Sequence, residues 1–170
     1  MTRRKRHGFG WIELIVVLLA LIALAAVLVP AISFELAAAR RARAQAALEQ
    51  IANGLIRYTA DTQLLPCGRE GRPELALLSG EGPIPTGLSA QVASPLRDYL
   101  TFNEHGAAGW QGPYCAVMDP DPWGQAYVVT VIGYQSRRPV WALSAGPDRR
   151  IDTPLFGHRL EGDDLGVRID

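Results

Sequence analysis

Hydrophobic residues are concentrated in one continuous run near the start of the chain. The 21 residues from Leu14 to Phe34 include no charged side chain. As an α-helix this run would extend about 31 Å, enough to cross a bilayer core of about 30 Å. A secretory signal would have a shorter apolar core, of about 7–15 residues, followed by a small-residue cleavage site. The run therefore predicts a membrane-spanning helix.

The helical pattern continues beyond the apolar run, and its character changes. Residues 31–62 are rich in Ala, Leu, Gln, Glu and Arg. Apolar side chains recur there at spacings of three and four residues, at Leu48, Ile51, Leu55 and Tyr58. Such spacing places them on one face of a helix, with polar residues opposite. We therefore predict one helix from Phe9 to Thr62, bent at Pro30, whose second half packs under a globular head.

Turn-forming residues follow this helix. Leu64-Leu65-Pro66 ends it, and residues 66–110 are rich in Gly and Pro. Two short helices are predicted in this stretch, at Pro73–Ser79 and at Pro95–Leu100, the second with Ser94 as its N-cap.

Strand patterns begin after Trp110. The β-branched segment Tyr127–Ile132 and the segment Val140–Ser144 predict two strands joined by a turn at 133–138. A third strand is expected either at Trp110–Met118 or at Val167–Ile169. The sequence thus predicts an α+β fold: a long N-terminal helix, membrane-spanning in its first half, packed on a small antiparallel sheet with a loop-rich C-terminus.

Charge differs between the two ends of the chain. The formal net charge is zero, but Arg3, Arg4, Lys5 and Arg6 form a basic leader without an acid. The chain after residue 8 holds 13 basic and 17 acidic groups, which argues against nucleic acid as a partner because phosphate binding needs a basic patch. A second basic cluster follows the apolar run and weakens the positive-inside signal for the orientation of the span. This cluster could instead form a subunit contact or a band that faces lipid headgroups. It consists of Arg40, Arg41 and Arg43.

Both cysteines lie beyond the apolar run. If the head is outside the cytoplasm, Cys67 and Cys115 can form a disulfide. It would close a loop of about 48 residues and contribute about 4 kcal/mol in the chain-entropy model. Two buried free thiols are the alternative.

An acid stands at the front of the apolar run. A charge at mid-membrane costs about 2.5–3.5 kcal/mol, so Glu13 is expected to have a partner. With the basic leader and the pair Gly8-Phe9, Glu13 resembles the class III signal of type IV pilin-like proteins. The match departs from the usual pattern at Gly10 and Trp11. An ordinary single-span anchor with a chance acid is the alternative interpretation.

The resemblance implies a processing and assembly pathway. A prepilin peptidase would cut between Gly8 and Phe9 and methylate the new N-terminus. Glu13 then stands at the fifth mature position and neutralises the amine of a neighbouring subunit inside lipid. Pro30 stands where the family often has a helix-kinking proline. Phe9, Glu13 and Pro30 are thus the expected assembly residues.

The C-terminal half holds a second set of motifs. Gly112-Pro113-Tyr114, Asp119–Tyr127 and Leu143–Asp148 come in this order. Together they resemble the major pseudopilin of the type II secretion system, which typically shows Gly-Pro-Tyr, Asp-Pro-Trp-Gly-x-x-Tyr and Ser-x-Gly-x-Asp. The resemblance covers both ends of the chain and matches residues 64–108 poorly.

That family binds one calcium ion in its acidic C-terminal loop. Residues 146–170 hold six acids here, which suits a hard cation that takes six to eight oxygens. They are Asp148, Asp152, Glu161, Asp163, Asp164 and Asp170. Matching implies Asp148, Asp163 and Asp164 as ligands, with a carbonyl from Ala145.

The loop also departs from the family pattern in a way that disfavours a cation. A stretch usually rich in Gly and acids is replaced by Arg149, Arg150, Pro154 and His158. The alternative is a solvated loop whose carboxylates pair with Arg149, Arg150 and Arg159.

Other candidate sites fail on composition. Asp119-x-Asp121 begins like an EF-hand loop, but Trp123 replaces an oxygen ligand, so a rigid turn with Trp123 anchored in the core is expected. The segment Ala142–Gly146 around Ser144 resembles a nucleophile elbow but has Ala142 in place of its first Gly. His105 and His158 have no supporting groups for a triad or a zinc site. The sequence therefore predicts no enzyme.

These features divide the chain into five segments: a leader (1–8), a transmembrane and filament-core helix (9–34), its periplasmic continuation (35–63), a variable helix-loop region (64–109) and a sheet with an acidic loop (110–170). The resemblance implies a pseudopilus subunit, anchored in the inner membrane with a periplasmic head. Its partners would be the peptidase, its own copies, other pseudopilins and an inner-membrane assembly platform. A minor type IV pilin, a DNA-uptake pseudopilin, and a membrane-anchored periplasmic binding or enzyme domain are the alternatives.

Overall fold

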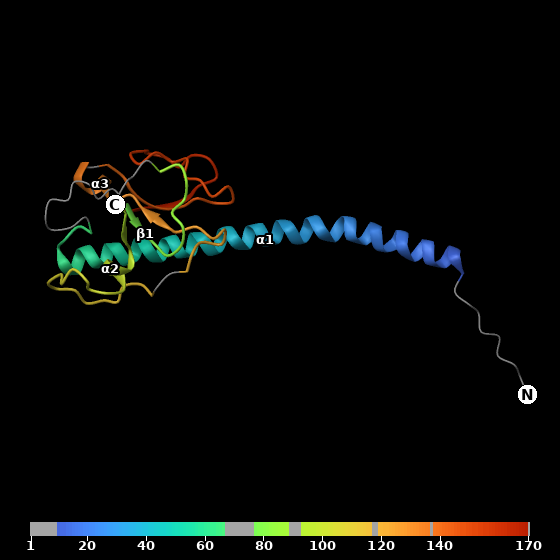
Figure 1. The fold of residues 1–170 in the computed structure, drawn as a ribbon, viewed down its shortest axis with the longest axis horizontal. Coiled ribbons are helices and arrows are strands. Elements are labelled where there is room, and N and C mark those ends of the chain that lie inside the picture. The colour runs from blue at the N-terminus through green and yellow to red at the C-terminus, as the bar shows by residue number, and fades with distance from the viewer. Residues whose placement is uncertain (1–9, 67–76, 89–92, 117–118, 137, 170) are drawn as a thin grey trace, which may run out of the picture. The chain divides into compact units, whose positions relative to one another are not determined.

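The computed structural model describes residues 10–66, 77–88, 93–116, 119–136 and 138–169 (Figure 1). The chain forms two compact units, Met1–Ala39 and Arg40–Asp170. One helix, α1 (Trp11–Thr62, 52 residues), supplies the described part of the first unit and enters the second. The described residues of the second unit add a five-stranded sheet and two short helices, so the chain has the predicted α+β composition.

The described part of the first unit is a largely apolar helix. Its large apolar side chains from Trp11 to Phe34 are all exposed. The helix continues through Pro30, which lacks a backbone N–H, and the Ser33 hydroxyl donates to the Pro30 carbonyl at 2.8 Å. By length and composition α1 can span a membrane, which agrees with the single span predicted from the apolar run.

In the second unit, α1 packs along the predicted stripe. Leu48, Ile51 and Leu55 are fully buried, and Tyr58 nearly so. Burial of each aliphatic side chain stabilises the unit by about 1.5–3 kcal/mol. Gly54 lies close to Leu100, since an added Cβ would be 3.3 Å from Leu100 Cδ1. The helix ends at Thr62, as predicted from the sequence.

The sheet has the strand order β2-β1-β3-β4-β5. Its strands are β1 (Leu77–Ser79), β2 (Ala93–Pro95), β3 (Val128–Val129), β4 (Val140–Ser144) and β5 (Leu165–Ile169). Three of the four pairings are antiparallel, but β1 and β2 run parallel. The predicted antiparallel sheet is therefore wrong at this edge. A parallel pair needs a connection of about a dozen residues or more, and residues 80–92 provide one.

Several predicted local elements change in the fold. Leu77–Ser79 is strand β1, not the end of a helix, and the rest of the predicted Pro73–Ser79 helix lies outside the described residues. The second short helix, α2, covers only Arg97–Leu100 and has Leu96 as its N-cap. Ser94 and Pro95 belong to β2 instead. Pairing with β1 thus overrides the capping signal.

The predicted strand Tyr127–Ile132 is reduced to β3 (Val128–Val129), and helix α3 (Ile132–Ser136) begins at the residue where the strand was expected to end. The N–H of Trp141 donates to the Thr130 hydroxyl at 2.9 Å, so a side chain replaces the backbone acceptor just beyond β3. Strand β4 has the predicted bounds. The third strand is the C-terminal one, β5, and the described part of 110–118 contains no strand.

Strand β4 is buried on both faces and separates two cores. Val140 and Ala142 belong to the core shared with α1, whereas Trp141 and Leu143 belong to a second core with Val128, Ala145 and Ile151. This alternation follows the two-residue period of a strand. The indole N–H of Trp141 donates to the Gly157 carbonyl at 3.0 Å. The acidic C-terminal loop is thereby held against the sheet face opposite α1.

Candidate functional site

The predicted processing residues lie at the N-terminal end of α1. Gly8 and Phe9 are outside the described residues. Glu13 lies in the first turn of the helix, and its Oε2 accepts a hydrogen bond from the Gly10 N–H at 3.0 Å. A glutamate at the third helical position that accepts from the N-cap N–H forms half of a capping box. The carboxylate is therefore directed back toward the start of the chain.

Three carboxylates of the C-terminal loop come together. One oxygen each from Asp148, Asp152 and Asp163 lies within 4.8 Å of the others, in an arrangement that can hold a metal ion. We call these three residues the acidic cluster. The sequence predicted Asp148 and Asp163 as ligands but did not assign Asp152. Its position four residues after Asp148 was the available signal, and the two arginines between them obscured it.

Asp164, the other carboxylate predicted as a ligand, is not one of the three residues of the acidic cluster. The residue is only 7% exposed, and its Oδ2 accepts from the N–H groups of Asp152 and Thr153, at 3.0 and 2.7 Å. Burial raises the pKa of the Asp164 carboxyl, and the hydrogen bonds from Thr153 and Asp152 oppose that rise. Asp164 therefore fixes the backbone that carries Asp152. Ala145 is fully buried in the second core.

Two glycines allow the segment after β4, which carries Asp148 and Asp152, to pack closely against the segment before β5, which carries Asp163. Gly146 and Gly162 have φ of 67° and 66°, in the left-handed region that favours glycine. An added Cβ would lie 2.5 Å from the Asp163 carbonyl at Gly146, and 2.5 Å from Asp152 Oδ2 at Gly162. The Oδ1 atom of Asp164 is buried without a hydrogen-bond partner in the described part of the chain. The oxygen donors and the tight loop fit a small hard cation.

A buried aspartate connects this loop to the Asp-Pro-Trp-Gly segment. Asp121 is 4% exposed, and its Oδ1 accepts from the N–H groups of Trp123 and Gln125, at 3.0 and 2.8 Å. Its Oδ2 accepts from the Ser144 hydroxyl at 2.6 Å. The turn was predicted, but its anchor is Asp121, because Trp123 is half-buried and belongs to neither core cluster. Two motifs distant in sequence thus share one hydrogen-bonded junction.

The Gly-Pro-Tyr motif is fixed to the end of α1. The Tyr114 hydroxyl donates to Asp61 Oδ2 at 2.9 Å and accepts from the Gln111 N–H at 2.9 Å. Burial raises the pKa of the Tyr114 phenol. Its ring also packs edge-on against Tyr58. The motif therefore ties the loop before Cys115 to the end of α1 and stabilises the second unit.

The predicted disulfide involves Cys67, which lies outside the described residues, and so it stays a prediction. Cys115 packs on α1, with its Sγ 3.5 Å from the Gln50 carbonyl. Burial raises the pKa of the Cys115 thiol, which disfavours a reactive thiolate.

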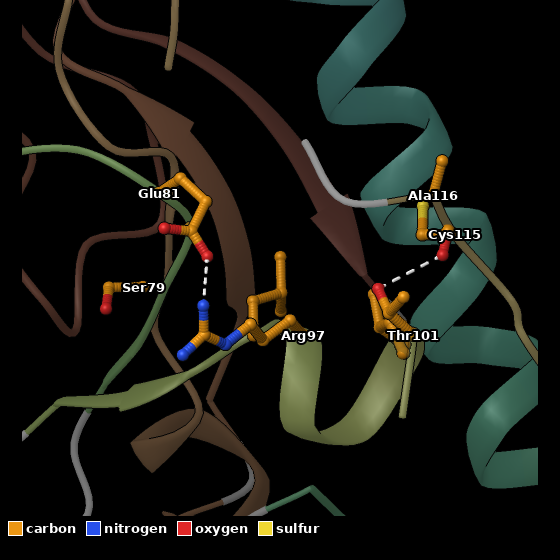
Figure 2. A pocket seen from close by; sticks show the side chains of 9 residues that line it. Ser79, Glu81, Arg97, Thr101, Cys115 and Ala116 are labelled. Carbon is orange, nitrogen blue, oxygen red and sulfur yellow. Dashed lines mark hydrogen bonds and ion pairs between the residues drawn. The ribbon is translucent and has the colours of Figure 1, made fainter. Parts of the chain in front are cut away.

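Figure 2 shows a pocket beside α2, next to Cys115. Arg97 Nη1 and Glu81 Oε1 form an ion pair of 2.9 Å there, and the Thr101 hydroxyl donates to the Cys115 carbonyl at 3.1 Å. The cavity measures about 20 Å³, room for about one water molecule. It is too small to favour a small-molecule substrate.

Comparison of the chain with protein-family models, with curated proteins and with solved structures finds no match. The functional assignment therefore depends on the chain's own residues.

Proposed function

We propose that this chain is a structural subunit of a type II secretion pseudopilus, closest to the major pseudopilin. The observation that carries the proposal is the division of α1. Its first half is apolar and exposed, whereas its second half supplies the buried stripe of a small α+β head. A subunit that leaves the membrane to join a fibre needs such a helix, because lipid and neighbouring helices can cover the same apolar surface.

The motifs of the head support the same class. The Asp-Pro-Trp-Gly segment and the Ser-x-Gly-x-Asp segment share the Asp121–Ser144 hydrogen bond. Two of the three C-terminal motifs by which the chain resembles the pseudopilin are therefore joined to each other by one hydrogen bond. In the fibre, head-to-tail contacts whose rotation does not close a ring generate a helix of subunits. Assembly on the inner-membrane platform would then push secreted proteins outward.

Processing by a prepilin peptidase tests this proposal. Co-expression with an active peptidase is expected to remove eight residues, and Gly8→Ala is expected to prevent the cut. Intact-protein mass spectrometry measures both results. The matched control is Gly10→Ala, which changes a glycine two residues beyond the cut and is expected to leave processing in place. An unchanged mass of the wild-type chain in the presence of peptidase would contradict the assignment. It would favour a permanently anchored binding or enzyme domain instead.

Calcium is the ion proposed for the acidic cluster. Carboxylate oxygens from Asp148, Asp152 and Asp163 would hold it, with Asp164 fixing the loop behind them. A bound divalent ion would join the two arms of the loop and stabilise the head.

Saturating calcium is therefore expected to raise the melting temperature of the full chain in detergent relative to chelator. Calcium at 100 times its Kd would add about 2.7 kcal/mol to the free energy of unfolding. Asp163→Asn is expected to remove the shift, whereas Asp119→Asn, an exposed acid outside the acidic cluster, is expected to retain it. Equal melting temperatures of the wild-type chain in calcium and in chelator would remove the ion from the proposal.

A further inference from the structure

A cationic side chain already contacts the acidic cluster. Arg150 Nε lies 3.0 Å from Asp152 Oδ1, in an ion pair whose side chains are 64% and 35% exposed. The backbone N–H of Arg150 also donates to Asp148 Oδ1 at 2.9 Å. One residue thus contacts two of the three carboxylates.

The adjacent arginine provides a comparison. Arg149 has φ of 64°, and its N–H donates to the Gly146 carbonyl at 3.3 Å. Its guanidinium forms no ion pair within the described part of the chain. The two arginines therefore carry the same charge beside the same loop, but within the described part of the chain only the Arg150 side chain forms an ion pair with a carboxylate of the acidic cluster.

A guanidinium and a metal ion compete for the charge of the Asp152 carboxylate. Calcium takes six to eight oxygen ligands, and three carboxylates already supply few of them. A positive charge at this distance also repels a divalent cation, although solvent and salt screen the repulsion at an exposed site. Arg150 thus offsets the mutual repulsion of the carboxylates without a metal and opposes the metal when it enters.

We propose that Arg150 is a tethered competitor of the cation at the acidic cluster and sets its affinity. In the metal-free chain its guanidinium neutralises Asp152. When the cation binds, Asp152 exchanges the guanidinium for the metal and the Arg150 side chain turns to solvent. This inference rests on the calcium binding proposed above. The affinity of the wild-type chain is consequently weak, and millimolar calcium is the range in which occupancy changes.

Calcium titration of the full chain in detergent, followed by isothermal calorimetry, tests the competition. Arg150→Gln is expected to lower the Kd about fivefold, the upper end of the effect of an exposed ion pair. Arg149→Gln removes the same charge without an ion pair and is expected to lower the Kd less than twofold. Raising the salt concentration should reduce the difference between Arg150→Gln and wild type. Far-UV circular dichroism and the chelator melting temperature establish that each variant is folded.

The outcomes separate the competition from calcium binding itself. If wild type and Arg150→Gln bind calcium equally, the competition is wrong and the calcium proposal stands. If Arg149→Gln tightens binding as much as Arg150→Gln, the effect is general charge and the role assigned to Arg150 is wrong. If neither wild type nor Arg150→Gln binds calcium up to about 10 mM, both proposals are wrong, because this concentration exceeds the Kd range of weak extracellular calcium sites.

Discussion

Replacing Glu13 by alanine is expected to abolish filament assembly while the precursor is still processed. In the proposed fibre the Glu13 carboxylate offsets the N-terminal amine of a neighbouring subunit in an apolar environment. Removing one partner of a buried ion pair costs about 3–5 kcal/mol, because the other charge remains without compensation. Each 1.4 kcal/mol is a factor of ten in the association constant, so assembly should fall by more than about a hundredfold.

The Glu13→Gln variant separates this role from helix capping. Glutamine can still accept the Gly10 N–H, as glutamate does at 3.0 Å, because both residues serve in a capping box. It cannot neutralise an amine. Electron microscopy of cells overproducing the assembly machinery should show filaments with wild type but not with Glu13→Gln.

Glu35→Ala, an exposed acid further along α1, is the control and should assemble. Normal filaments from Glu13→Gln would show that Glu13 only caps the helix.

Asp121→Ala is expected to be the most destabilising single change in the head that leaves the apolar core intact. The substitution removes the acceptor of three hydrogen bonds, from two backbone N–H groups and the Ser144 hydroxyl. Each buried donor left without a partner costs about 1–3 kcal/mol, so a loss of about 3–5 kcal/mol in the free energy of unfolding is expected. The melting temperature should fall by about 10 °C or more.

Thermal unfolding of the full chain in detergent, followed by circular dichroism, measures this effect. Asp121→Asn keeps an oxygen for the two N–H groups and is expected to lose much less than Asp121→Ala. Asp119→Ala changes an exposed aspartate in the same segment and should unfold like wild type. A melting temperature of Asp121→Ala within about 2 °C of wild type would contradict the anchoring role, since a surface substitution has an effect of this size.

The hydrogen bond between Asp121 and Ser144 also lies at the start of the acidic loop. The Ser144 hydroxyl that donates to Asp121 lies 3.4 Å from the Gly146 N–H, which donates to it in turn. Strand β4 ends at Ser144, and the loop carrying Asp148 starts directly after it. Loss of Asp121 is therefore expected to disturb the acidic cluster as well as the turn.

The sequence by itself determined the elements whose cause is local. The uncharged run from Leu14 to Phe34 specifies a helix that can span a membrane, because length and apolarity alone decide this. The spacing of Leu48, Ile51 and Leu55 identified the buried face of α1, because helical periodicity fixes which side chains share a face. Strand β4 was likewise predicted with its bounds, from β-branched and aromatic residues that follow a turn.

Only the tertiary structure decided features that depend on which distant segments meet. The pairing of β1 with β2 made a strand of Leu77–Ser79, where the local pattern predicted a helix. Gly162 lies close to Asp152, whose carboxylate is part of the acidic cluster. The buried Asp164 carboxylate accepts hydrogen bonds from backbone N–H groups. Hydrogen bonds such as Asp121–Ser144 join residues 23 positions apart. Sequence periodicity describes the face of one element, whereas these contacts depend on how several elements pack together.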